Sequence, residues 1–176
     1  MKKIYIILSV LGVLSCLSSC EQEDRKYQGP LFVEFSPDLY GQVASPSGIR
    51  KEAFAVGEDQ IGVQLIGLAT EQALTVNFRM VDQVFYLITL DRYVTDLPEG
   101  LNPDQYQTIL ATAKYGVDYT FDNLSGVTYD SDFGRGSISV SPGSQFGVIP
   151  INILQKGGAQ FFCVLDDSEN LQANKP

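Results

Sequence analysis

Three cysteine thiols and 21 carboxylates are the main reactive groups of this 176-residue chain, which contains no histidine. Without an imidazole it lacks the commonest general base near neutral pH, together with the Ser-His-Asp and Cys-His arrangements and most zinc sites. A pair of carboxylates can hydrolyse a glycosidic bond, but so many acidic residues offer plausible pairs by chance. We therefore expect a protein that is not an enzyme.

The first twenty residues have the pattern of an export signal that ends in a cysteine. Lys2 and Lys3 precede an apolar run, 4–14, whose 11 residues are too few to cross a hydrocarbon core that needs ~20. Ser18 and Ser19 then stand directly before Cys20. Residues 17–20 resemble the lipobox of bacterial lipoproteins. This resemblance implies a signal peptide at 1–19 and acyl chains such as palmitate on Cys20.

A second cysteine and an acidic stretch refine this interpretation. Cys16 is a competing lipidation site, but the larger Leu14 stands where Cys20 has the small Ser18. Residues 20–29 read as a solvated tether that begins Glu-Gln-Glu-Asp after the cysteine. Such a start is similar to that of surface lipoproteins of the Bacteroidota. It implies a protein held by lipid in the outer membrane and facing the cell surface, with the membrane as its first partner. The alternative orientation faces the periplasm.

Charge and size limit what the rest of the chain does. Removal of 1–19 leaves 157 residues with ten basic and 21 acidic side chains, a formal charge of −11. Such a chain repels phosphate, and no cluster of Lys and Arg offsets this, so we expect no nucleic-acid partner. The length suits a single domain over 30–176. Cys163 is then left without a second cysteine for a disulfide, and its apolar neighbours predict that it fills the core.

Short strands separated by turn residues dominate the mature chain and predict an antiparallel β-sandwich. The clearest is 74–80, in which Leu74, Val76, Phe78 and Met80 alternate with polar residues. A turn is expected at 141–144, Ser-Pro-Gly-Ser. The remaining predicted strands are 30–35, 61–68, 126–129, 136–140, 147–153 and 160–165.

Residues 82–115 depart from this pattern of short strands and turns, and we interpret them as an insertion. Asn102 followed by Pro103 is typical of a helix N-terminus, and Tyr106, Ile109, Leu110 and Ala113 follow at helical spacing. The sequence therefore predicts a short helix over 103–113.

From about residue 113 onward the chain resembles a known family. Gly-Val-Asp-Tyr at 116–119, the turn at 141–144 and the Ile-rich strand at 147–153 are the residues concerned. They are similar to the Calx-beta-like, immunoglobulin-like sandwich of Bacteroidota lipoproteins. The resemblance implies an all-β, immunoglobulin-like fold and a setting at the cell surface, often beside systems that capture glycans.

Two sets of residues are candidate sites. Calx-beta domains bind calcium through acidic loops, and Asp166, Asp167 and Glu169 directly follow the last predicted strand. The alternative is that these are solvated turn carboxylates and that the chain needs no cofactor. The second set is aromatic and could stack on sugar rings or pack the insertion onto the sandwich. It consists of Phe85, Tyr86, Tyr93, Tyr106 and Tyr115.

These observations predict a non-catalytic binding or accessory module on the cell surface, engaged in glycan capture or in contact with a partner protein. The alternative is a structural subunit of a surface assembly. A hydrolase that uses carboxylates alone is the third hypothesis, which would require two acids facing each other across a cleft.

Overall fold

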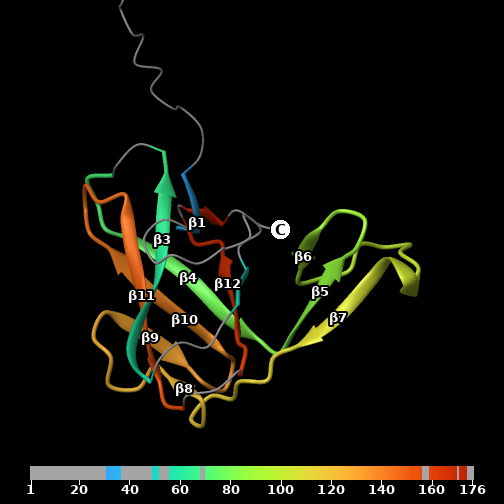
Figure 1. The fold of residues 1–176 in the computed structure, drawn as a ribbon. Coiled ribbons are helices and arrows are strands. Elements are labelled where there is room, and N and C mark those ends of the chain that lie inside the picture. Colours follow the sequence, from blue (N-terminus) through green and yellow to red (C-terminus); the bar gives the residue numbers. More distant parts are fainter. Residues whose placement is uncertain are drawn as a thin grey trace, which may run out of the picture.

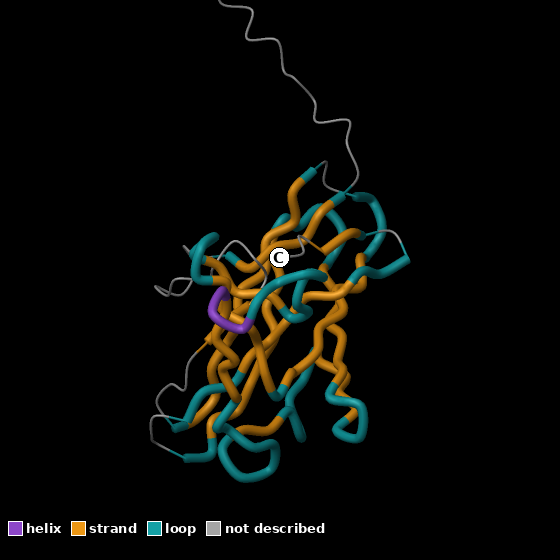
Figure 2. Tube along the Cα trace, turned by 90° about the vertical axis from the view of Figure 1, so that its right-hand side faces the viewer, coloured by secondary structure: helices purple, strands orange, loops and turns teal. Residues whose placement is uncertain are grey.

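The chain is all-β in the part that the computed structural model describes, which is residues 31–36, 49–51, 56–67, 70–155, 159–169 and 171–173. The predicted signal peptide, Cys20 and the tether lie outside these residues. Among the described residues, no helix has the length and apolar character needed to cross a bilayer. These residues form thirteen strands in three sheets and one short 3-10 turn, η1 at Pro103–Gln105. Figure 1 shows the arrangement of the strands, and Figure 2 shows the helical turn in purple.

Two five-stranded sheets form the body of the molecule. The first has the order β13-β1-β3-β11-β8 and the second the order β2-β12-β4-β10-β9. Their pairings are antiparallel except for β1 with β13. The strands of the first sheet are β1 Phe32–Phe35, β3 Gly57–Ile66, β8 Tyr119–Thr120, β11 Phe146–Ile153 and β13 Gln172–Ala173. Those of the second are β2 Ile49–Lys51, β4 Leu74–Val81, β9 Val127–Asp130, β10 Arg135–Val140 and β12 Phe162–Asp166.

The two sheets face each other across one apolar core, as expected of a sandwich. Alternate residues of β3 and β11 are buried on one side, and alternate residues of β4 and β10 on the other. At Gly147 of β11 the sheets approach so closely that a Cβ atom would lie 2.6 Å from a methyl group of Val140 in β10. Cys163 is fully buried in this core, which confirms the predicted packing role.

All seven predicted strands are confirmed, with shifts of a few residues at their ends. The predicted turn at 141–144 is also present: the Ser144 N–H donates to the Ser141 carbonyl at 3.1 Å, and Gly143 has a φ of +75°. Proline before a glycine of positive φ is typical of a type II turn. This turn carries the chain from β10 of one sheet to β11 of the other.

The insertion is a third, three-stranded sheet in the order β6-β5-β7, with β5 at Gln83–Leu87, β6 at Arg92–Val94 and β7 at Tyr106–Leu110. Figure 1 shows it projecting to one side of the body. Its stem is closed by a hydrogen bond of 2.7 Å from the Ala111 N–H to the Asp82 carbonyl. The buried Val84 packs against Phe162 and Val164 on the outer face of β12. This contact ties the third sheet to the body.

The predicted helix over 103–113 is wrong. The start signals of Asn102 and Pro103 serve a single turn, η1, in which the Asn102 N–H donates to the Gln105 side chain at 2.9 Å. Residues 106–110 then pair with β5 from Leu87↔Tyr106 to Gln83↔Leu110. A helix here would lose this ladder, and the β-branched Thr108 and Ile109 suit a strand better.

Candidate functional site

The outer face of the second sheet carries a polar groove where the third sheet leaves it uncovered. Residues that alternate with the core positions point outward, and the register aligns Thr128, Ser137, Asn77 and Asp166 in one row across β9, β10, β4 and β12. A neighbouring row places Asp130 opposite Arg135. The groove has a volume of ≈ 370 Å³, within the range of ~300–1,000 Å³ that ligand sites occupy.

Uncharged polar side chains and charged side chains line this groove together. The polar lining consists of Asn77, Thr128, Asp130, Arg135, Ser137, Asp166 and Asp167. Its carboxylates accept hydrogen bonds, its guanidinium donates them and its amide does both. The groove therefore offers donors and acceptors side by side to a ligand with many hydroxyl groups.

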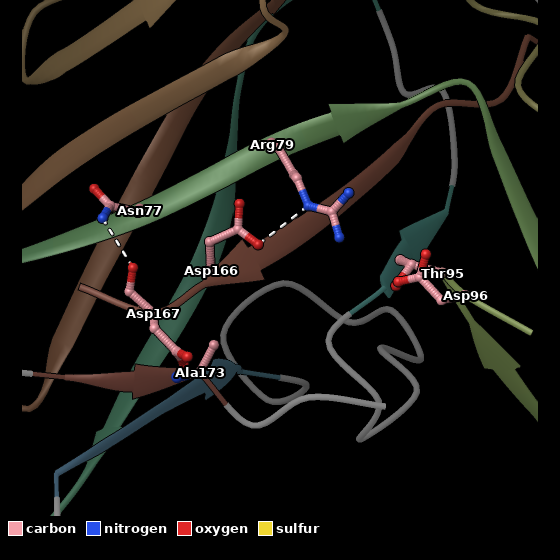
Figure 3. Close-up of polar contacts among 7 residues, drawn as sticks. All are labelled: Asn77, Arg79, Thr95, Asp96, Asp166, Asp167 and Ala173. Carbon is pink, nitrogen blue, oxygen red and sulfur yellow. Dashed lines mark hydrogen bonds and ion pairs between the residues drawn. The ribbon is translucent and has the colours of Figure 1, made fainter. Parts of the chain in front are cut away.

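An ion pair, drawn in Figure 3, lies at one end of the groove. The Arg79 Nε donates to Asp166 Oδ1 at 3.1 Å, and each of the two side chains is 32% exposed. The Asn77 amide donates to the Asp167 carbonyl at 3.1 Å, and the Asp167 carboxylate accepts the Ala173 N–H at 2.8 Å. These bonds hold the polar floor in one geometry before any ligand arrives.

A second hollow of ≈ 230 Å³ continues the groove on the far side of this ion pair. It is lined by Arg79, Asp166 and β12 together with Val94, Thr95 and Asp96, which lie at the end of β6. Figure 3 shows Thr95 and Asp96 beyond the guanidinium of Arg79. The third sheet therefore supplies one wall of an extended depression whose floor is the second sheet.

The turn between β9 and β10 adjoins the groove and carries an exposed aromatic residue. Phe133 is 75% exposed, and its turn joins Asp130 to Arg135, both of which line the groove. The Asp132 N–H donates to the Asp130 carboxylate at 3.0 Å, and the Met80 N–H donates to the Gly134 carbonyl at 2.7 Å. The turn is thus anchored on both sides of Phe133.

The predicted aromatic site is distributed over three places. Phe85 and Tyr106 meet edge to face on one side of the third sheet, with centroids 5.9 Å apart. Tyr86 and Tyr93 pair across β5 and β6 on the other side, at 5.2 Å. The Tyr86 hydroxyl donates to Asp91 at 2.6 Å, and this bond raises the pKa of the phenol. These four residues therefore form two pairs on opposite faces.

Tyr115 lies elsewhere, at the edge of the sandwich core. The centroid of its ring lies 5.8 Å from that of Tyr119 and 5.1 Å from that of Tyr129. Its hydroxyl donates to the Asp122 carboxylate at 2.6 Å. Burial and this hydrogen bond raise the pKa of Tyr115. The structure does not bring Tyr115 together with the other four aromatic residues.

Two of the three predicted calcium ligands have partners within the protein. Asp166 pairs with Arg79, and Asp167 accepts the Ala173 N–H, while Glu169 is exposed on the following turn. Within the described ranges, no group of three His, Cys, Asp or Glu side chains is placed to hold a metal ion. The calcium site stays a prediction, and Asp166 and Asp167 line the groove.

Sequence reasoning missed Asn77, Thr128, Arg135, Ser137 and Phe133. The available signal was the run of polar residues at outward positions, such as Thr75, Asn77 and Arg79 between Leu74, Val76, Phe78 and Met80. That signal gives the solvent face of one strand but not which strands lie beside it. Comparisons with protein-family models, with curated proteins and with solved structures found no match to this chain.

Proposed function

We propose that this protein is a lipid-anchored binding module of the bacterial cell surface that captures glycans in the groove on its second sheet. The acyl chains on Cys20 hold it at the outer membrane, and 20–29 spaces it from the bilayer. Each buried methylene contributes ~0.8 kcal/mol, so several acyl chains together make release rare. The body is an immunoglobulin-like, Calx-beta-like sandwich with a strand insertion, and the module is not catalytic.

The observation that carries the proposal is the row of outward polar side chains across four strands, within a groove of ligand size. Sugars present adjacent hydroxyls that both donate and accept, and amide, carboxylate and guanidinium groups can bind two of them at once. The mixture of Arg135 with Asp130 and Asp167 gives the groove no strong positive charge. This favours a neutral glycan over an anionic polymer, in line with the acidic chain.

Affinity electrophoresis of the detergent-extracted full chain in gels that contain single polysaccharides tests the proposal. We expect retarded migration in at least one gel and lower retardation for the variant Asn77→Ala, which removes a central group of the floor. Thr75→Ala is the matched control, because Thr75 is exposed on the same strand but does not line the groove. Unretarded migration of the folded wild type in every gel would refute glycan capture.

The anchor is tested separately. Mass spectrometry of the protein from its native cells should show an N-terminal acylated Cys20, and Cys20→Ala should leave the membrane fraction. An intact, unmodified N-terminus would contradict the proposal.

A subunit of a surface assembly is the second candidate, and the outer face of the first sheet favours it. Phe146 and Val148 of β11 and the following Leu154 are exposed at alternating positions, by 48%, 37% and 38%. Exposed apolar side chains aligned on one face are typical of contacts between proteins. Chemical cross-linking in the native cell should then give a stable product, and a purely monomeric profile would count against assembly.

A further inference from the structure

We infer that Phe133 is the stacking platform of the groove and that the bound glycan presents a pyranose face free of axial oxygens. This inference rests on the proposed function and names the class of sugar that the site takes. It starts from Phe133, the most exposed aromatic side chain among the described residues, whose turn joins two residues that line the groove.

The position of Phe133 follows from the strands that flank it. Asp130 ends β9, Arg135 begins β10, and the two are opposite each other in the ladder and line the groove. The four residues between them form the turn at its rim. With 75% of its surface exposed, the ring contributes little to the core, so its side chain is available to a ligand.

The turn is also held in place, which limits the entropy that a ligand must overcome. Gly134 adopts a φ of +63°, and its carbonyl accepts the Met80 N–H from the neighbouring strand. On the other side, the Asp130 carboxylate accepts the Asp132 N–H. These bonds fix the backbone on both sides of Phe133 and preorganise the ring.

Stacking chemistry then selects the sugar. The face of an aromatic ring is negative and attracts the C–H groups on an apolar face of a pyranose, while the hydroxyls at the ring edge remain free for polar groups. An axial oxygen on that face would hold the two rings apart. A sugar stacked on Phe133 can direct its equatorial hydroxyls toward Asp130 and Arg135.

The experiment uses two polysaccharides and two kinds of substitution. In hydroxyethyl cellulose the sugar rings carry no axial oxygen, whereas in yeast α-mannan each ring carries one axial oxygen on each face. We expect the detergent-extracted full chain to be retarded by hydroxyethyl cellulose and not by the mannan. Phe133→Ala should weaken this retardation about tenfold, a change of 1.4 kcal/mol that lies within the worth of an aromatic contact. Its thermal unfolding should not change, since the ring is exposed.

The absence of tryptophan from the chain makes a direct readout available. F133W creates a single indole at the rim, and its fluorescence should change when hydroxyethyl cellulose is added. F146W is the matched control, because Phe146 is also exposed but lies on the outer face of the other sheet. Its emission should stay constant.

The outcomes separate the two proposals. If the cellulose derivative retards Phe133→Ala as strongly as the wild type and leaves F133W emission unchanged, the stacking platform is refuted while glycan capture stands. Retardation by the mannan alone would overturn the sugar class. If neither these polymers nor any other polysaccharide retards the wild type, both the platform and the proposed function fall.

Discussion

Gly136 lies beneath the floor of the groove, and its replacement by alanine is the most informative test of how the second sheet is built. The residue sits on the core side of β10, between the outward Arg135 and Ser137. A Cβ atom there would lie 2.4 Å from Cζ of Phe78 and 2.8 Å from the Thr128 carbonyl oxygen. Real Cβ atoms do not approach other heavy atoms this closely.

The ring of Phe78 has little freedom to give way. It is 1% exposed, and its centroid lies 5.4 Å from that of Phe121 and 6.2 Å from that of Tyr129. Additional volume in a packed core costs about 1–3 kcal/mol. For a chain of this size each kcal/mol lowers the melting temperature by about 2–4 °C, so Gly136→Ala should lower it by roughly 2–12 °C.

Differential scanning calorimetry of Gly136→Ala measures this loss. Ser139→Ala is the matched control, because Ser139 is exposed on the same strand and its change should leave the melting temperature within about 2 °C. Combining Gly136→Ala with Phe78→Leu, which shortens the opposing side chain, should cost less than the sum of the two single changes. A Gly136→Ala protein that melts with the wild type would refute this account of the packing.

Three further predictions concern the packing of the third sheet, the ion pair of Arg79 with Asp166, and the pKa of Tyr129. Phe162→Ala removes the side chain on which Val84 of the third sheet packs and should lower the free energy of unfolding by about 3–5 kcal/mol. The rate of amide hydrogen exchange should rise most in residues 83–110. A uniform rise over the chain would contradict this packing. Asp166→Asn breaks an ion pair with Arg79 in which each side chain is about one-third exposed. It should lower the free energy of unfolding in urea by less than about 1 kcal/mol, and a loss several times larger would contradict this. Burial raises the pKa of Tyr129 to about 12 from 10, so the neutral phenol is favoured in the folded state. The resulting stabilisation is complete below about pH 10 and is lost as the pH rises from 10 to 12. Between pH 10 and 12, the urea midpoint of Tyr129→Phe should fall less steeply with pH than that of the wild type. An unchanged slope would refute the raised pKa of Tyr129.

The strands could be predicted because each one carries its own evidence. Leu74, Val76 and Phe78 alternate with polar residues, and this period identifies both the strand and its buried side. The helix failed because Asn102 and Pro103 signal where a helical turn starts but not how long it lasts. Its length was decided by β5, whose backbone groups pair with 106–110.

The site could not be predicted, because it depends on strand order. Asn77, Ser137 and Asp166 become neighbours only when β10 and β12 take their places on either side of β4. Nothing local to these residues specifies that order. The positions of the five aromatic residues could not be predicted for a related reason: Phe85 and Tyr86 are adjacent in a strand, and adjacent residues of a strand point to opposite faces.

The hydrogen bond that closes the stem of the third sheet has a consequence for how this sandwich can diversify. Because the hydrogen bond between Ala111 and Asp82 joins the two ends of the insertion, the sandwich fixes only where the insertion starts and ends. It does not constrain the length or internal structure of the insertion. A shorter hairpin or a larger insertion could replace the segment between Asp82 and Ala111 without disturbing the pairing of β4 with β12. What any replacement must supply is an apolar surface to shield Phe162 and Val164 from water. Such a replacement would change the wall of the depression that the third sheet supplies, and with it the ligand, while the floor formed by the second sheet stays the same.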